Sequence, residues 1–310
     1  MGQYKTVTGQ NIYDVATHIY GSLDGLTDLL VSNPRLSFAQ TLETGTILNY
    51  TDDFLVNKGI TSALSASNIT PSNGSANVYY EPEPSVRIAD LYCSSSQLTG
   101  AITVSGNGVL FVDWGDNSPY QKITLTASTK SHSHIFNNKI NTDRRVRLFG
   151  DVRLIDLDVS RVAPKIVHFL KKVAVERYTH GASVSPIEHI RLCDQVYKVS
   201  LAGSKISDLL PLISCTNLMD LDLRGDKIKT EHIETYLIKL VANYGARRGC
   251  TIRIDADIQG TYQQPSKDAN QKYIIKNAME AVWVLTNEPS WQEGGFWHII
   301  INNTDYTTEV

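Results

Sequence analysis

Two pairs of aspartates are the residues of this chain whose types and spacing could do chemistry. Asp156 and Asp158 in "LIDLDVS" stand two positions apart, so a strand would place both carboxylates on one face. That arrangement is found in glycosidases and nucleases. Asp113 and Asp116 flank the Trp-Gly of "VDWGDNSP" and could bind a cation. The surrounding sequence decides whether either pair is free to react.

The local context favours structural roles for these groups. Carboxylates in a glycine turn more often accept hydrogen bonds from their own backbone, and a calcium loop would need further oxygen ligands at set spacing. His132 and His134 lack a third ligand nearby, so we predict no metal site. Four cysteines without a Cys-x-x-Cys pair are expected to be buried free thiols: Cys93, Cys193, Cys215 and Cys250.

The motifs of common enzymes are absent from the sequence. It contains no Gly-x-Ser-x-Gly elbow, no Walker loop, no His-Glu-x-x-His and no dinucleotide glycine fingerprint. We therefore expect a non-enzymatic protein with no catalytic residues and no cofactor.

Composition narrows the partners. The chain has 310 residues, 42% of them hydrophobic, which is enough for more than one domain. A net charge of −3, with only short basic clusters, predicts neither a nucleic-acid nor a membrane partner. No apolar run is long enough to span a bilayer. The first residues lack the pattern of a signal peptide, so we expect synthesis in the cytoplasm without one.

The first fifty residues predict a strand, two helices and a second strand. Asn11 is an N-cap candidate and Gly21 suits the left-handed end of a helix. Pro34 stops a second helix, and "YKTV" and "TILNY" are the predicted strands. The first helix carries one apolar stripe made of Ile12, Val15, Ala16, Ile19 and Tyr20.

The residues "Y-x-x-V-x-G-x-x-I-x-D-V-A", "L-L-x-x-N-P" and "L-x-x-G-x-x-L" resemble a LysM domain, here residues 1–51. The resemblance implies a groove for N-acetylglucosamine polymers between two loops. Wall-binding members usually carry Gly-Asp-Thr where this chain has Gly-Gln-Asn, so a LysM-like fold used for protein contacts is the alternative. The implied groove residues are Gly9, Gln10, Asn11 and Ile12 on one side and Asn33, Pro34, Arg35 and Leu36 on the other.

Residues 52–84 are rich in Ser, Asn and Pro and predict an extended linker. Short alternating runs in residues 85–150 predict a small antiparallel β-sandwich with Trp114 in its core. Within it, "VDWGDNSP" and "SHSHIF" resemble the Trp-Gly-Asp and His-aromatic signatures of PKD-like domains.

Residues 151–310 predict a repeat architecture. Three segments, 152–162, 196–206 and 218–228, share apolar residues at positions one, four, six and eleven, and the last two start 22 residues apart. A degenerate turn is expected between the first two, although Ala174, Arg177 and Thr179 fit it poorly and Ile187–Leu192 looks like a competing strand. Further expected elements are a helix over 230–245, strands over 250–256 and 296–301, and a helix over 268–285.

This frame resembles the leucine-rich repeats of Bacteroides-type proteins, in which a Trp-Gly-Asp sandwich often precedes the repeats. Alternate strand positions would face the concave side of such a stack and are the expected partner-binding residues. They are Asp156, Lys198, Ser200, Asp220, Asp222 and Arg253.

The predicted fold class is therefore multidomain α+β: a βααβ LysM-like module, a small antiparallel sandwich and a short leucine-rich-repeat α/β solenoid. LysM-like modules also occur in tail and baseplate proteins of bacteriophages and related contractile injection machines. The leading hypothesis is such a structural component, found in the virion or tail particle and bound to other tail or baseplate proteins. The alternatives are a peptidoglycan-binding module and an adaptor that binds a protein through the repeats.

Overall fold

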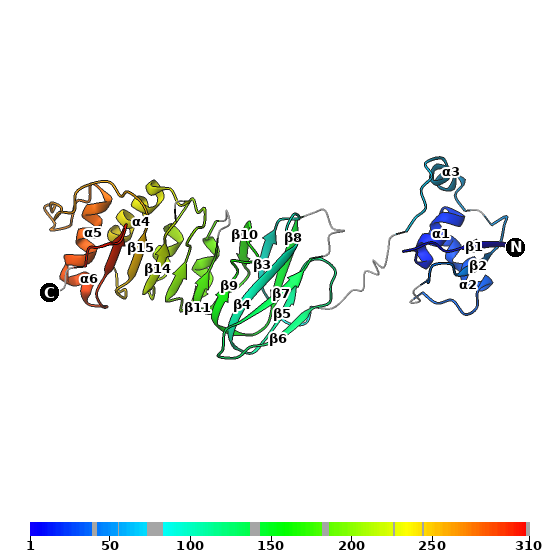
Figure 1. The fold of residues 1–310 in the computed structure, drawn as a ribbon, viewed down its shortest axis with the longest axis horizontal. Helices are drawn as coiled ribbons and strands as arrows, with labels where there is room; N and C mark the ends of the chain where they lie inside the picture. The colour runs from blue at the N-terminus through cyan, green and yellow to red at the C-terminus, as the bar shows by residue number, and fades with distance from the viewer. Residues whose placement is uncertain are drawn as a thin grey trace. The chain divides into compact units, whose positions relative to one another are not determined.

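The computed structural model describes residues 1–38, 42–54, 56–72, 83–136, 143–181, 186–225, 227–243 and 245–307. The chain divides into two compact units, Met1–Glu81 and Pro82–Val310 (Figure 1). Across the two units the structure is mixed α/β. It contains several sheets, and both α-helices and 3₁₀ helices lie between the strands in the sequence. Each unit is described by itself below.

The first unit contains the predicted order of strand, two helices and strand. Asn11 caps the first helix, and Gly21 ends it in the left-handed region with φ 72°. The two strands pair antiparallel, and the helices bury one apolar stripe against them. The elements are β1 (Gly2–Lys5), α1 (Ile12–Tyr20), the 3₁₀ turn η1 (Leu23–Gly25), α2 (Leu26–Ser32) and β2 (Ile47–Tyr50).

Part of the expected linker is helical, so the prediction of an extended chain over residues 52–84 was wrong at this place. Helix α3 (Lys58–Ala66) begins at Asn57, whose side chain accepts from the backbone of Ile60. The backbone N–H groups of Val56 and Asn57 donate to the carbonyl of Tyr20, which holds the segment against α1. A Ser- and Thr-rich composition has low helix propensity and concealed this helix. Residues 73–82 of the expected linker lie outside the described residues.

The second unit contains a five-stranded antiparallel sheet and a long sheet. The five-stranded sheet has the order β10 (Ile166–Phe169), β3 (Arg87–Cys93), β8 (Arg144–Phe149), β5 (Val109–Asp113) and β6 (Gln121–Thr124). In the long sheet, β7 and β4 pair antiparallel, β4 and β9 pair antiparallel, and the strands from β9 to β16 are parallel. Its order is β17 (Thr304–Asp305), β16 (His298–Ile301), β15 (Thr251–Ile254), β14 (Asp220–Leu223), β13 (Lys198–Ser200), β11 (Val173–Thr179), β9 (Arg153–Asp158), β4 (Thr99–Asn107) and β7 (Lys130–Ile135), with β12 (Cys193–Asp194) beside β11.

We expected a domain boundary between residues 85–150 and residues 151–310, but the two stretches belong to one compact unit. Strand β4 from the first stretch pairs with β9 from the second, and β10 returns to pair with β3. One hydrophobic core runs through both stretches and includes Trp114, Leu157 and Leu221. The physical reason is that an open parallel edge exposes unpaired backbone groups, which β4 satisfies here.

The three predicted repeat strands are found as β9, β13 and β14. The stretch expected to be a degenerate turn is strand β11, which pairs in parallel register with both β9 and β13. The competing segment Ile187–Leu192 is not a strand: it forms the 3₁₀ helix η2 (Glu188–Leu192) with Ile187 and Ile190 buried.

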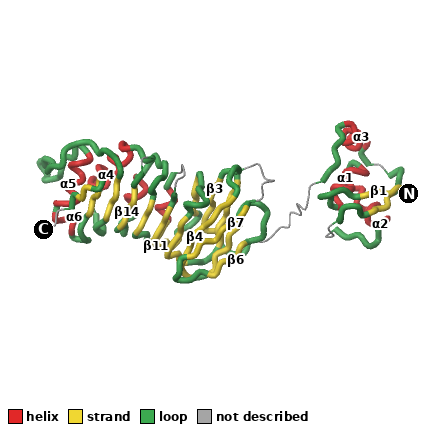
Figure 2. The backbone as a smooth tube through the Cα atoms, in the orientation of Figure 1, coloured by secondary structure: helices red, strands yellow, loops and turns green. Residues whose placement is uncertain are grey.

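Helices lie on one side of the long sheet toward its C-terminal end (Figure 2), and their buried residues share one core with the apolar residues of the strands. The helix expected over 230–245 is α4 (Thr230–Ala242), and the strand expected over 296–301 is β16. The helix expected over 268–285 begins ten residues later, because Gln271 takes a left-handed φ of 61° in a turn that pairs Lys267 with Tyr273. The other helical elements are η3 (Leu210–Ser214), α5 (Ala278–Asn287) and α6 (Pro289–Gln292).

Candidate interaction surfaces

Three of the four residues expected on the first groove wall have structural roles. Ile12 is 1% exposed and belongs to the core of the first unit. Asn11 and Asp14 form a reciprocal capping box at the start of α1. Gly9 is half-buried and takes a φ of 83°, which favours glycine there. These residues shape the loop more than they present it to a ligand.

Gln10, expected as a groove residue, is buried beneath its own chain. Its amide oxygen accepts from the hydroxyl of Tyr4 at 3.0 Å and from the backbone of Val7 at 2.9 Å. Its amide nitrogen donates to the carbonyl of Pro71 at 2.9 Å. The bond to Pro71 shows that the segment following α3 lies against this loop, and only 3% of Gln10 is exposed.

The second wall is divided between the core and the surface. The side-chain nitrogen of Asn33 donates to the carbonyls of Leu29 and Asn49, both at 2.8 Å, and its oxygen accepts from the backbone of Asn49 at 2.9 Å. Asn33 therefore ties α2 to β2. Leu36 packs on the core. Pro34 and Arg35 are exposed.

The exposed aromatic side chains of Tyr13 and Phe38 form a pair that the sequence analysis did not predict. Tyr13 follows the first of the two predicted groove segments, and Phe38 follows the second. The rings of Tyr13 and Phe38 stack with centroids 6.4 Å apart and an interplanar angle of 25°. Tyr13 is 40% exposed and Phe38 57% exposed. Tyr13 stands off the apolar stripe of α1, which was the available signal that its ring points outward. Arg35 precedes Phe38 in the same loop, and its guanidinium makes no hydrogen bond or ion pair with the described residues.

The six expected partner-binding residues of the repeats lie on one face of the long sheet, which we call the outer face. Strand register places Asp156, Lys198 and Asp220 in one row, with Arg177 between the first two. Burial alternates along β14 and β15, so the intervening apolar residues face the core. A second, neighbouring row contains Asp158, Thr179, Ser200, Asp222 and Arg253.

Asp156 is the most heavily bonded group on the outer face. Arg177 donates to it twice, at 2.5 and 2.6 Å, and the hydroxyls of Ser105 and Thr129 donate at 2.6 and 2.7 Å. The hydrogen bonds from Arg177, which outweigh the effect of burial, lower the pKa of Asp156 to about 2. Asp156 thus stays ionised at neutral pH and cannot serve as a general acid.

Asp220 and Asp222 also pair with cations, whereas Asp158 accepts from the backbone N–H of Ser160 at 2.8 Å. Asp220 lies 2.8 Å from Lys198 and 2.6 Å from Arg253. Burial raises the pKa of Asp220, but the two cations outweigh it and the net pKa is lowered. Asp222 lies 2.7 Å from Arg224, whose hydrogen bonds lower its pKa. The face is consequently polar but close to charge-balanced.

The Trp-Gly-Asp turn is structural. Asp113 accepts from the backbone of Gly115 at 2.7 Å and is ion-paired with Arg147. Asp116 accepts from the backbone of Ser118 at 3.2 Å and bonds the Nε2 atom of His134 at 2.7 Å. Both carboxylates therefore hold the turn, as the sequence predicted.

Trp114 fills the core beside this turn. It is 1% exposed, stacks on His134 with centroids 5.0 Å apart, and donates its indole N–H to Gln121 at 2.9 Å. All four cysteines are buried and free, and burial raises the pKa of each thiol. They are inert at neutral pH.

Neither a family model, nor a curated protein, nor a solved structure matches this chain. Across the part of the chain that the structure describes, no three His, Cys, Asp or Glu side chains are placed to hold a metal ion. Among the same residues, no helix combines the length and the apolar character that crossing a bilayer requires.

Proposed function

We propose that this chain is a non-enzymatic assembly protein, a tail or baseplate component of a bacteriophage or of a related contractile injection machine. In this proposal the first unit is LysM-like, and the second combines a PKD-like sandwich with leucine-rich repeats. Residues 1–51 carry the LysM-like pattern, which recurs in such particles, and the second unit offers a large ordered surface for a protein partner.

The observation that carries the proposal is the outer face of the long sheet. Consecutive strands present two rows of polar side chains in register, and three of the carboxylates in these rows, those of Asp156, Asp220 and Asp222, are ion-paired with arginine or lysine. A surface fixed in this way pays little conformational entropy on docking. Because its charges are balanced, it suits a partner matched by shape and hydrogen bonds more than a highly charged polymer.

Mass spectrometry of tail particles purified from the bacterium that encodes the chain tests the proposal. We expect this chain at a fixed ratio to the other particle proteins. A matched pair of variants then locates the interface. Ser200→Arg adds bulk in the second row of the outer face, whereas Thr235→Arg adds the same side chain to an exposed position of α4, on the other side of the sheet.

Incorporation into particles should fall for Ser200→Arg and persist for Thr235→Arg, with both proteins folded by circular dichroism. Absence of the wild-type chain from particles would refute the assembly role. Equal incorporation of both variants would keep the chain in the particle but remove the outer face as its contact.

The exposed pair of Tyr13 and Phe38 favours a second candidate, binding of peptidoglycan by the first unit. The two stacked aromatic rings form an exposed apolar patch, and such patches mark binding sites, including those on which sugar rings pack. Co-sedimentation with purified peptidoglycan tests it. The wild type should pellet at micromolar protein and Tyr13→Ala should not, with Leu23→Ala, an exposed apolar change elsewhere on the unit, as the control. A wild-type protein that stays in the supernatant rules this candidate out.

A further inference from the structure

A chain of three buried polar side chains connects strand β11 to the 3₁₀ helix η2. The hydroxyl of Tyr178 lies 2.8 Å from the Nδ1 atom of His180 and 2.8 Å from the Nε2 atom of His189. Tyr178 belongs to β11, and His189 belongs to η2. None of the three residues is more than 4% exposed. We call them the histidine cluster.

The hydrogen bonds of the cluster favour a neutral His189. The hydroxyl of Tyr178 has one proton, so it donates to one imidazole and accepts from the other. The second nitrogen of His189, Nδ1, is inaccessible to solvent and has no hydrogen-bond partner among the described residues. A proton added to His189 must therefore either break its bond to Tyr178 or remain on Nδ1 without an acceptor. A charged His189 is stable only where η2 has moved into solvent.

Burial has the same effect on both histidines. It lowers the pKa of His180 to about 4 and that of His189 to about 3. The charges of His180 and of His168, which lies on β10, lower the pKa of His189 further. The ring of Phe169 from the same strand packs against His189 with centroids 5.4 Å apart and supplies no charge. Both imidazoles of the cluster are therefore neutral at pH 7.

The other titratable groups around the cluster leave this charge state unchanged. Burial, and then Cys193 of β12 and Asp158 of β9, raise the pKa of the Tyr178 hydroxyl, which therefore keeps its proton. On η2 itself, Glu188 and Arg191 pair with each other at 2.9 Å on the surface. Within the described part of the chain, no carboxylate raises the pKa of the buried imidazole on η2.

We propose that the histidine cluster is a pH-sensitive latch, which holds η2 on β11 while both imidazoles are neutral and releases η2 when they take up protons in acid. Opening comes first, because solvent does not reach the Nδ1 atom of His189 in the closed form, and protonation then stabilises the open form. A five-residue 3₁₀ helix has few backbone hydrogen bonds of its own, so η2 is suited to local opening. The latch does not depend on the proposed assembly role.

Acid should favour the released form of η2 over a defined range of pH. A histidine whose pKa is lowered in the closed form contributes stability that is complete above its ordinary value of 6.5 and is lost as the pH falls toward the lowered value. Between pH 6.5 and pH 4 each histidine therefore raises the ratio of open to closed η2 by up to about tenfold per pH unit. The two together raise it by up to about a hundredfold.

Two of the four buried cysteines are placed to report the release. Cys193 directly follows η2, and the thiol of Cys215, whose pKa burial raises, lies 3.9 Å from the carbonyl of Ile190 in η2. The other two are Cys93 in β3 and Cys250 at the start of β15.

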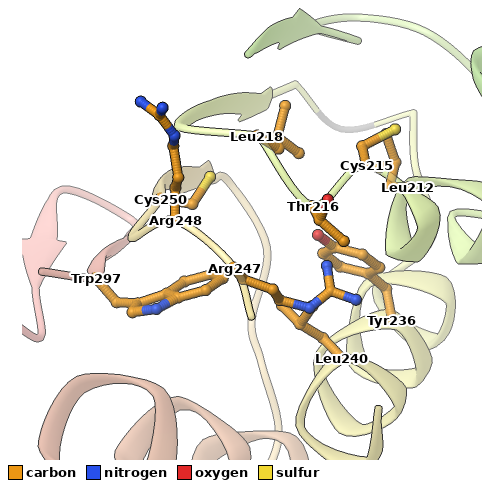
Figure 3. A pocket seen from close by; sticks show the side chains of 10 residues that line it. All are labelled: Leu212, Cys215, Thr216, Leu218, Tyr236, Leu240, Arg247, Arg248, Cys250 and Trp297. Atoms are coloured by element: carbon orange, nitrogen blue, oxygen red, sulfur yellow. The ribbon is translucent and has the colours of Figure 1, made fainter. Parts of the chain in front are cut away.

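A small cavity separates Cys215 from Cys250. It lies between η3, α4 and the segment that leads into β15, and both thiols line it (Figure 3). In Figure 3 Cys215 lies beside Leu212 of η3, whereas Cys250 lies beside Arg248. The cavity has a volume of about 10 Å³. That is room for one water molecule and not for a thiol reagent, so release of η2 should expose Cys215 without exposing Cys250.

Labelling of the four cysteines with a pyridyl disulfide, which also reacts with thiols in acid, tests the proposal. The labelling rate of each cysteine is read by mass spectrometry and divided by the rate of the same cysteine in the urea-unfolded protein at the same pH. From pH 6 to pH 5 we expect this ratio to rise by up to about a hundredfold for Cys193 and Cys215. At each pH the ratios for Cys93 and Cys250 should stay well below them.

Two histidine variants separate the cluster from other titrating groups. His189→Gln removes one titrating group, keeps an amide that can bond to Tyr178, and should reduce the rise to about tenfold per pH unit. His298→Gln is the matched control, because His298 is 43% exposed on β16, and it should keep the wild-type rise.

The wild type alone can overturn the proposal. Equal labelling of all four cysteines in acid would show that the unit opens as a whole, and labelling of Cys193 and Cys215 that does not change with pH would show that the cluster is no latch. A rise in His189→Gln as steep as in the wild type would also contradict the assignment.

Discussion

Replacing Asp156 by asparagine tests whether the outer face is held together by its own charges. The carboxylate accepts four hydrogen bonds, two of them from Arg177, and its side chain is 18% exposed. Asparagine keeps the shape but removes the charge and turns an N–H₂ group toward a cation. We expect the free energy of unfolding of the second unit to fall.

The size of the effect follows from the pKa of Asp156. A shift from 3.8 to about 2 corresponds to roughly 2 kcal/mol of stability at neutral pH, and partial exposure reduces this to about 1–2 kcal/mol. Because the pKa is lower in the folded state, this stability is fully present above the unfolded value of 3.8. It is lost as the pH falls from 3.8 toward 2.

Urea unfolding followed by tryptophan fluorescence measures the quantity directly. All four tryptophans lie in the second unit, so unfolding of the first unit does not contribute to the signal. Asp143→Asn is the control, because Asp143 and its partner Lys165 are about half exposed, and such surface pairs contribute little.

A loss of less than about 0.5 kcal/mol for Asp156→Asn at pH 7, or a loss equal to that of Asp143→Asn, would refute the reasoning. The same conclusion would follow if the difference between wild type and Asp156→Asn stayed constant from pH 5 to pH 2. The assigned cause requires that difference to shrink as the wild-type carboxylate takes up its proton.

Three further predictions follow from single residues. Arg35→Ala should weaken incorporation into particles at an unchanged melting temperature, because Arg35 is exposed and an anchoring arginine commonly contributes about 2 kcal/mol to binding; full incorporation of this variant would contradict its assignment as a contact. Trp114→Ala should lower the free energy of unfolding by about 3–5 kcal/mol in urea titrations, since the buried indole stacks on His134; a loss below about 1 kcal/mol would show that the site collapses freely. Burial lowers the pKa of His189 to about 3, so protonation favours the unfolded state and the free energy of unfolding falls as the pH drops from 6.5 to 4. His189→Gln should reduce this pH dependence of the free energy of unfolding by up to about 1.4 kcal/mol per pH unit, and an unchanged slope would refute the assignment.

Local signals predicted the elements whose structure depends on neighbours in sequence. The cap at Asn11, the left-handed Gly21 and the turn at Gly115 each rest on groups a few residues apart, and the structure contains all three. The strands predicted from the repeat pattern, β9, β13 and β14, were recognisable for a related reason. Each strand buries alternate residues, so a few consecutive residues are enough to show its alternation of apolar and polar side chains.

Elements that depend on distant partners could not be predicted in this way. The sequence of strand β11 fits the predicted repeat pattern poorly, but backbone pairing with β9 and β13 keeps the strand in register. Helix α3 is held by contacts with α1 in spite of a composition unfavourable to helices. The expected boundary at residue 150 failed for the same reason, since the pairing of β4 with β9 joins segments about fifty residues apart.

The candidate site residues also differ in whether local sequence or distant partners determine their role. Gln10 and Asn33 have the polar side chains that a ligand groove needs, yet both bond to their own backbone, and sequence alone does not distinguish the two uses. The outer-face residues were easier to place, because strand periodicity fixes which face a residue lies on. Their mutual pairing was not predictable, since it depends on the register between strands.

The ends of the long sheet explain why we assign the proposed contacts to its face. A parallel edge left open would present unpaired N–H and C=O groups to any passing strand. Strand β17 closes one end through a two-residue turn at Asn302 and Asn303, both with positive φ as such hairpin turns require. At the other end β4 and β7 cover β9 in antiparallel fashion, and β7 places Lys130 at the outer edge. Antiparallel strands of the same chain therefore cover both ends of the parallel strands β9 to β16. A partner cannot extend the sheet there by adding a further parallel strand. In our proposal the docking partner instead meets the two polar rows of the outer face, whose positions are fixed by strand register and in which Asp156, Asp220 and Asp222 are already ion-paired.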